Sequence, residues 1–326
     1  MSHGILGVEV KRLRRILVAI SDLDHSHGGV LRRAALLARA TGARVELFHA
    51  VTAPQTQWRQ IGGRLVPLQL TPDDSLRAAA KGLERIARSK LLLGCSVQSA
   101  TLADRPVHEA IVRRAIATRA DLIISGTRSR GLADRLVLRH TDWELVRHAP
   151  VPLLLVKSAR LRAKAVVLAA IDPLHANAKP ARLDAQILDV AAGMATLLKG
   201  PLHAVHAYMP LSVMLAAGIG EPVAWNTAEQ DAEYAQRVSR EFARALRSTQ
   251  IPGTRRHLRV GAAAVELPAC ANRIRATLVV MGAVSRSRLE RLLIGSTAEH
   301  VLDELACDVL IVKPRATKRP RSRRKG

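Results

Sequence analysis

Two stretches of this chain carry the same pattern, and this repeat limits the fold more than any other feature. Residues 121–157 have the sequence DLIISGTRSRGLADRLVLRHTDWELVRHAPVPLLLVK, and residues 279–313 have the sequence VVMGAVSRSRLERLLIGSTAEHVLDELACDVLIVK. Equivalent positions pair Gly126 with Gly282, Ser129 with Ser285, Arg130 with Arg286, Thr141 with Thr297, and Lys157 with Lys313. The chain is therefore a duplicated domain, and its copies differ in the loop between the two strands.

The rest of each half alternates apolar strands with amphipathic helices. In the first half we expect strands at 15–22, 45–51, 95–100, 121–125 and 150–156, and helices at 30–41, 71–92 and 106–119. In the second half we expect strands at 165–172, 201–208, 256–260, 277–281 and 308–312, and helices at 229–247, 262–275 and 297–306. This order predicts an α/β protein with two tandem Rossmann-like domains. Each is a five-stranded, mainly parallel sheet with helices on both faces. Residues 51–70 and 209–227 are expected to be irregular excursions that act as lids, partner surfaces or mobile loops.

Length and composition narrow the class of protein. A chain of 326 residues fits two domains, and 48% hydrophobic residues allow an aliphatic core although aromatic residues make up only 2%. Three widely spaced cysteines form neither a disulfide framework nor a metal motif, which suits a reducing compartment. Because the N-terminus has too short an apolar run for a signal peptide and no stretch is long enough to cross a membrane, we expect a soluble, cytoplasmic protein.

The net charge of +24 indicates a negatively charged partner. A C-terminal tail, which we expect to be disordered, holds a cluster of basic residues: Arg315, Lys318, Arg319, Arg321, Arg323, Arg324 and Lys325. Such a surface is suited to non-specific contact with RNA or DNA. An arginine-rich composition without a functional meaning is the alternative, and the scarcity of aromatic residues argues against base stacking.

The loop after residue 281 has the features of an anion site. Gly282 ends a strand without a side chain, and Gly295, Ser296 and Thr297 begin a helix whose free N–H groups and dipole favour a phosphate. Asp172 follows the first strand of the same half, so we expect it at the same edge of the sheet, where its carboxylate would accept a hydrogen bond from a ribose or adenine. The alternative is that the loop only packs and caps the helix.

These residues resemble the universal stress protein (UspA) superfamily, whose ATP-binding members carry G-x2-G-x9-G-[S/T] after the fourth strand. The second copy has Gly282-x2-Ser285-x9-Gly295-Ser296, so a serine replaces the second glycine. The family's acid matches Asp172, and its adenine-contacting backbone after the second strand matches His206-Ala207. The resemblance implies ATP in the second domain only, held by Ala170, Asp172, Ala207, Met281, Gly282, Ser285, Gly295, Ser296 and Thr297.

The first copy departs from that motif. Arg139 and His140 stand where the family has glycine and serine or threonine, so bulky side chains should fill the phosphate position although Asp22 and Gly126 remain. The segments 141–157 and 294–314 resemble the tandem, E-type branch of the family. The resemblance therefore divides the chain into an N-terminal extension (1–13), a first domain with a degenerate loop (14–158), a second domain with a nearly complete loop (163–314) and the basic tail (315–326).

The resemblance also implies an assembly and a function. The fifth strands of the two domains should pair and make an intramolecular pseudo-dimer. Association of two such chains into a homodimer is a further alternative. The protein would be a non-catalytic, cytoplasmic stress-response module, linked to resistance to DNA-damaging agents, that senses ATP through its second domain. A protein that binds RNA or DNA and a slow ATPase are the competing hypotheses.

Other candidate sites are weaker. His203 and His206 stand three apart on a strand and so point to opposite faces, and His25 and His27 lack further ligands nearby. Glu109 and Glu266 begin helices, where an acid complements the helix dipole. Cys270 and Cys307 are expected to be buried structural thiols.

Overall fold

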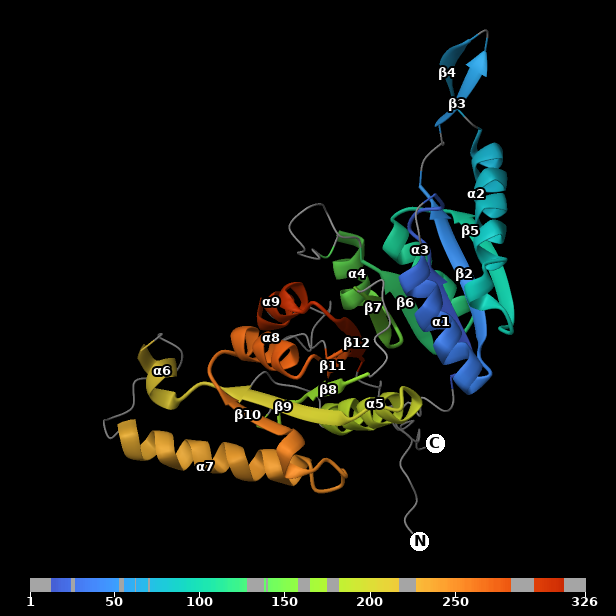
Figure 1. The fold of residues 1–326 in the computed structure, drawn as a ribbon. Helices are drawn as coiled ribbons and strands as arrows, with labels where there is room; N and C mark the ends of the chain where they lie inside the picture. The colour runs from blue at the N-terminus through green and yellow to red at the C-terminus, as the bar shows by residue number, and fades with distance from the viewer. Residues whose placement is uncertain are drawn as a thin grey trace, which may run out of the picture.

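A computed structural model provides the fold of the chain (Figure 1). It describes residues 13–24, 27–52, 56–61, 63–69, 71–127, 138, 140–157, 165–174, 182–216, 227–282 and 296–313. Within these ranges the expected strands and helices are present, with shifts of a few residues at several ends. The structure adds a hairpin at Thr56–Gln69 and helices at His140–His148, Leu183–Leu197 and Leu211–Ala216.

The first half forms a parallel sheet in the order β5-β2-β1-β6-β7. Its strands are β1 (Arg15–Ala19), β2 (Arg44–Val51), β5 (Val97–Ala103), β6 (Leu122–Gly126) and β7 (Leu153–Val156). Its helices are α1 (Gly28–Thr41), α2 (Pro72–Ala87), α3 (Val107–Ala117) and α4 (His140–His148), with a short 3-10 helix at Lys90–Leu92.

The second half repeats this arrangement in the order β10-β9-β8-β11-β12, and its neighbouring strands are again parallel. The strands are β8 (Val167–Ala170), β9 (Leu202–Tyr208), β10 (Arg256–Val260), β11 (Leu278–Gly282) and β12 (Asp308–Val312). The helices are α5 (Leu183–Leu197), α6 (Leu211–Ala216), α7 (Thr227–Ala245), α8 (Ala263–Arg273) and α9 (Ser296–Glu304), with a 3-10 helix at Gly253–Arg255.

The last strands of the two halves, β7 and β12, pair antiparallel and join both sheets into one sheet of ten strands. Leu154 stands opposite Leu310 at the centre of this junction. Since each strand would otherwise be an exposed edge, the pairing supplies hydrogen-bond partners to both. The expected pseudo-dimer and the two five-stranded α/β units are confirmed.

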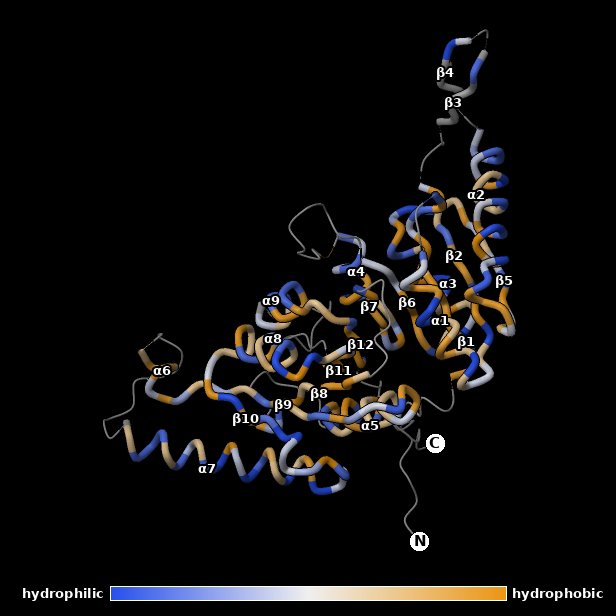
Figure 2. The backbone as a smooth tube through the Cα atoms, in the orientation of Figure 1, coloured by the Kyte–Doolittle hydropathy of each residue, from blue (hydrophilic) through white to orange (hydrophobic). Residues whose placement is uncertain are grey.

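Two apolar layers hold the helices to the sheet. The first lies under α1, α2, α5 and α7, and the second lies under α3, α4, α8 and α9. Each layer includes buried residues from both halves, so the core is continuous across the junction of β7 and β12. Figure 2 shows hydrophobic strands at the centre and alternating hydropathy along α7, whose Val238 and Phe242 are buried, as is Leu246 just after the helix.

Side chains also cross the junction, and they do so reciprocally. Lys157, after β7, is buried, and its Nζ donates hydrogen bonds to the carbonyl oxygens of Leu302 and Leu305, the latter at 2.8 Å. Lys313, after β12, donates from Nζ to the carbonyl oxygens of Val146 and Arg147. Each lysine therefore caps the last turn of the other half's helix, where carbonyl groups lack partners within the helix. The repeat predicted that these lysines are equivalent but gave them no role.

A buried ion pair reinforces the same junction. Nε of Arg33, on α1, donates to Oδ2 of Asp308, on β12, at 2.7 Å, and Oδ1 of Asp308 accepts the backbone N–H of Lys157 at 3.0 Å. Both charged side chains are less than one tenth exposed. The first and second halves are thus joined by strand pairing, by apolar packing and by buried charge.

The helix expected at 71–92 begins as predicted but ends early. Thr71 caps α2 by accepting the backbone N–H of Asp74 at 3.1 Å, and Pro72 occupies the first turn. The helix ends at Ala87, because Ser89 turns the chain and accepts the backbone N–H of Leu91 at 3.4 Å. Serine side chains compete for backbone hydrogen bonds in this way. The leucines that follow Ser89 continue the apolar pattern, so the sequence alone predicted a helix that is too long.

The expected irregular excursions contain regular structure. The first includes a two-stranded hairpin of β3 (Thr56–Ile61) and β4 (Arg64–Gln69), which projects from the rest of the first half in Figure 1. Gly63, with φ of 81°, supplies its left-handed turn residue. The second includes α6, whose first turn is held because Asp231 on α7 accepts the backbone N–H of Ser212 at 3.0 Å. The prediction that these segments are irregular was therefore wrong for both of these stretches.

Candidate functional site

The carboxyl ends of β8, β9 and β11 lie side by side, since these strands are neighbours in the sheet. This edge holds Ala170, Ala207, Met281 and Gly282, four of the residues that the resemblance assigns to a nucleotide, and Asp172 follows just beyond β8. Thr297 is exposed in the first turn of α9, and Ser296 is its first residue. Ser285 and Gly295 lie outside the described residues, as do Arg286, Arg288, Arg291 and the basic tail.

Asp172 is a buried acid whose backbone is fixed by a second acid. The backbone N–H of Asp172 donates to Oδ1 of Asp184 at 3.1 Å, and Asp184 is itself buried in the first turn of α5. Both carboxylate oxygens of Asp172 are inaccessible, and within the described part of the chain neither accepts a hydrogen bond. A buried acceptor without a donor costs about 1–3 kcal/mol, so this carboxylate is suited to a ligand that brings donors.

Aromatic side chains cluster at the same edge of the sheet as this acid. The ring of His206, on β9, lies 6.5 Å from the ring of Tyr208 and 6.2 Å from that of Phe242, and Tyr208 meets Tyr234 edge to face at 6.0 Å. Burial, together with the negative charge of Asp172, raises the pKa of Tyr234. The phenol therefore lies within the field of the carboxylate. Flat aromatic faces beside a hydrogen-bond acceptor suit a nucleobase with an exocyclic amine.

Sequence reasoning missed this aromatic group. Tyr234 lies in the helix expected at 229–247 and Tyr208 ends the strand expected at 201–208, but neither side chain was predicted to have a role in the site. The signal was nevertheless present, because the whole chain has only two tyrosines and two phenylalanines. Three of these four residues meet at one edge of the second sheet.

His206 has a structural role that is repeated in both halves. Its Nδ1 lies 3.1 Å from the carbonyl oxygen of Ile171, and Nδ1 of His49 lies 2.8 Å from the carbonyl oxygen of Ile20. Each histidine ties the end of the second strand to the end of the first. The expectation that His203 and His206 face opposite sides holds, because His203 instead meets His257, with 2.9 Å between Nδ1 and Nε2. Burial lowers the pKa of His203 to about 4.

Gly282 is required by packing. A Cβ added there would lie 2.8 Å from Cδ2 of Leu183 and 3.4 Å from Cδ1 of Ile187, both on α5. The equivalent glycine, Gly126, would meet Cγ2 of Val30 on α1 at 2.6 Å. The space beside both glycines is therefore used by a helix that covers the sheet, which gives Gly282 a packing role in addition to its predicted place at a ligand site.

Replacing Gly282 with alanine should lower the free energy of unfolding by about 1–3 kcal/mol, because α5 must move away from the sheet. Urea unfolding followed by circular dichroism would measure the change. Gly253→Ala is the matched control, since nothing lies within 4 Å of its added Cβ. Equal stability of the two variants would contradict the packing role of Gly282.

The corresponding edge of the first half differs. Oδ1 of Asp22 accepts the backbone N–H of Asp24 at 2.9 Å, so this acid turns towards its own loop. His140 begins α4 and meets His108 at 6.3 Å between ring centroids, as part of a group in which His108 and His148 both approach Oε2 of Glu144. Arg139 lies outside the described residues.

Other predicted features gave limited chemistry. Cys270 is buried and Cys307 half-buried, and burial raises the thiol pKa of both, to about 12 for Cys307. Within the described ranges, no group of three or more potential ligands is arranged to hold a metal ion. His25, one of the two loop histidines, lies outside those ranges. In the part of the chain that the structure covers, no helix has the length and apolar character needed to cross a membrane.

The fold has counterparts among known proteins. The model of the Universal stress protein family matches residues 12–157 and 167–313. Universal stress protein E of Photorhabdus laumondii is 24% identical over 311 residues, which cover 91% of this chain and 94% of the relative. A universal stress protein of Thermus aquaticus is 33% identical over 149 residues, 44% of this chain and 98% of the relative.

A solved structure shares the fold over most of the chain. The crystal structure of a functionally unknown protein from Pseudomonas aeruginosa PAO1 is 28% identical, with a TM-score of 0.66 and 94% of both chains covered. With two family matches, one on each five-stranded unit, the chain belongs to the universal stress protein family and carries its domain twice in tandem.

Proposed function

We propose that this protein is a non-catalytic stress-response module whose second domain, residues 163–314, binds an adenine nucleotide. The observation that carries the proposal is Asp172: a buried carboxylate with no hydrogen-bond donor among the described residues, beside Tyr208, Tyr234 and His206. The adenine amine or the ribose hydroxyls would supply donors to the carboxylate, and the rings would contact the base.

The first domain, residues 14–158, acts as a scaffold in this proposal. Asp22 has a partner in its own loop, and His140 belongs to the group around Glu144. We propose ATP as the nucleotide, because the family resemblance implies it, and the N-terminus of α9 would bind its phosphates. Residues Ser285, Gly295 and Ser296 would complete the phosphate contacts. We place the protein in the cytoplasm, with resistance to DNA-damaging agents as its physiological setting.

Calorimetric titration of ATP into the full chain tests the proposal, with Asp172→Ala as the main variant. We expect one ATP per chain and at least about tenfold weaker binding in Asp172→Ala, because a desolvated carboxylate makes strong hydrogen bonds. The same variant should be no less stable without ligand, since it removes a buried acceptor that lacks a donor. Asp189→Ala, an exposed acid on α5, should change neither property.

Two further experiments distinguish nucleotide binding from the alternative functions. Gly295→Arg copies the residue at position 139 and should abolish ATP binding while leaving the fold intact. Raising the salt concentration should weaken ATP binding only modestly if the site is built, but steeply if the basic chain attracts polyanions. Absence of saturable binding to the unaltered chain, or equal loss in the variants of Asp172 and Asp189, would refute the nucleotide site.

A further inference from the structure

A cavity of about 150 Å³ lies between the two halves, far from Asp172 in the fold. Leu36 and Leu37 of α1 and Leu154 of β7 line it from the first half, while Met194 and Leu198 contribute from the end of α5. The remaining wall includes Thr277 and Leu278 at the start of β11 and Asp308 at the start of β12. The cavity therefore lies at the amino edge of the second sheet, opposite the edge that holds the candidate nucleotide site.

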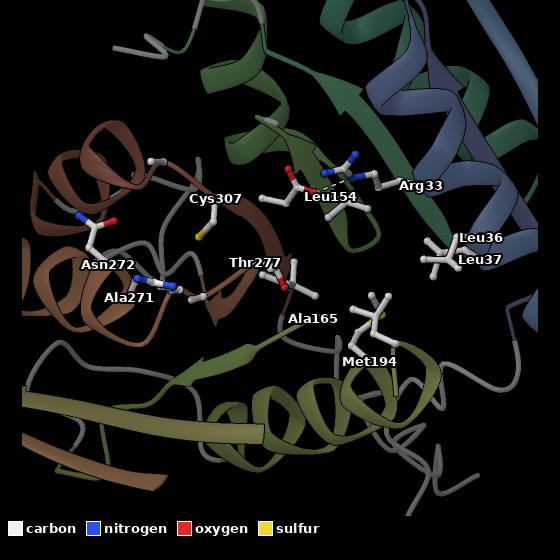
Figure 3. A pocket seen from close by; sticks show the side chains of 16 residues that line it. Arg33, Leu36, Leu37, Leu154, Ala165, Met194, Ala271, Asn272, Thr277 and Cys307 are labelled. Carbon is white, nitrogen blue, oxygen red and sulfur yellow. Dashed lines mark hydrogen bonds and ion pairs between the residues drawn. The ribbon is translucent and has the colours of Figure 1, made fainter. Parts of the chain in front are cut away.

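The lining is apolar at one end and polar at the other. Figure 3 shows Leu36 and Leu37 on one side of the cavity, with Asn272 and Cys307 on the opposite side and Met194 below. The hydroxyl of Thr277 is already used, since it donates to the carbonyl oxygen of Val166 at 3.1 Å and accepts that residue's N–H at 2.9 Å. The cavity can therefore receive a molecule with an aliphatic body and one polar end.

The charged residues of the lining determine the net charge at the polar end of the cavity. Arg33 and Asp308 form the buried ion pair described above, so their charges compensate one another. Arg275, just beyond the end of α8, is the other ionised residue of the lining. Its side chain is exposed, and within the described residues no ion pair or hydrogen bond of its guanidinium is found. The polar end thus carries one uncompensated positive charge.

We propose that this cavity binds a medium-chain aliphatic carboxylate, with its hydrocarbon chain among the leucines and Met194 and its carboxylate on Arg275. A cavity of about 150 Å³ is large enough for benzene, so it has room for about six carbon atoms of the hydrocarbon chain. The remaining carbons, with the carboxylate, would extend to the exposed Arg275. A planar guanidinium matches a carboxylate in two parallel hydrogen bonds. Because the walls come from both halves, the ligand would bridge the pseudo-dimer.

Calorimetry with octanoate on the full chain tests this site. We expect one octanoate per chain, and about tenfold weaker binding in Arg275→Gln, which keeps the length of the side chain but removes its charge. Arg273→Gln is the matched control, because Arg273 is exposed two residues away and lies outside the cavity lining. Octylamine should bind the unaltered chain at least about tenfold more weakly than octanoate, since its charge has the wrong sign.

A second variant tests the hydrocarbon part. Leu198→Trp enlarges a half-buried wall residue and should abolish the binding of both octanoate and uncharged octanol, with an unchanged circular dichroism spectrum as the check on folding. Saturating ATP should leave octanoate binding unchanged, because the two sites lie at opposite edges of the sheet. Equal weakening by Arg275→Gln and Arg273→Gln, or failure of octanoate to saturate the unaltered chain, would overturn the proposal.

Discussion

Replacing Arg33 with methionine should lower the free energy of unfolding by about 3–5 kcal/mol. Nε of Arg33 lies 2.7 Å from Oδ2 of Asp308, and the two side chains are only 8% and 7% exposed. The substitution removes the cation from a buried carboxylate, whose desolvation cost is then no longer offset. Because Arg33 belongs to the first half and Asp308 to the second, the loss should fall on the junction of the halves. Urea unfolding followed by circular dichroism measures it.

Two further variants define what the pair contributes. Arg77→Met removes an exposed ion pair with Asp74 and should change stability by less than about 1 kcal/mol. The double variant Arg33→Met with Asp308→Leu should recover most of the lost stability, because two apolar side chains leave no buried charge at this position. A loss in Arg33→Met no larger than that in Arg77→Met would show that the pair does not stabilise the junction.

The architecture could be predicted because its signals are local and occur twice. Thr71 and Pro72 mark a helix start by their own backbone preferences, and α2 begins there. The apolar runs that became β6, β7, β11 and β12 are buried on both faces, as parallel strands in such sheets are. The pairing of β7 with β12 was predicted from the family resemblance, since nothing in Leu153–Val156 alone selects its partner, and the structure adds that the two strands run antiparallel.

The hairpin was missed although the sequence held a signal for it. Gly62 and Gly63 stand between two runs of strand-forming residues, a pattern typical of a tight hairpin turn. The length of the excursion favoured an irregular loop, and the hairpin makes most of its hydrogen bonds within itself rather than with the sheet. In contrast, α6 depends on a side chain of α7, because Asp231 holds its first turn. Such a tertiary contact has no local signature.

The candidate site was only partly accessible to sequence reasoning. Asp172 could be placed because it follows a strand whose carboxyl end must lie at the crevice. Its partnership with Asp184 and the approach of Tyr234 arise from the docking of α5 and α7, which bring distant residues to one edge. Gly282 was predicted to be important, but its packing reason depends on how closely Leu183 approaches the strand.

The chain should gain about 2 kcal/mol of stability between pH 8 and pH 10.5 through Lys313 alone. Burial lowers the pKa of Lys313 to about 8, below the 10.5 of an exposed lysine. Below pH 8 the amine is charged in both the folded and unfolded states. Between pH 8 and pH 10.5 the unfolded state binds more protons, so stability rises with pH.

The two pKa values of Lys313 alone would give a gain in stability of about 3 kcal/mol. The gain is smaller because the carbonyl oxygens of Val146 and Arg147 accept hydrogen bonds from the amine and favour its charged form. Many other groups titrate in the same pH range, so the test compares the stability of the unaltered chain with that of a variant that lacks this amine. Urea unfolding of the unaltered chain and of Lys313→Met is compared at several pH values from 7 to 11. The stability of the unaltered chain should rise relative to the variant across the window. A constant difference would mean that the amine stays charged in the folded protein, and that α4 holds Lys313 as a permanent ion.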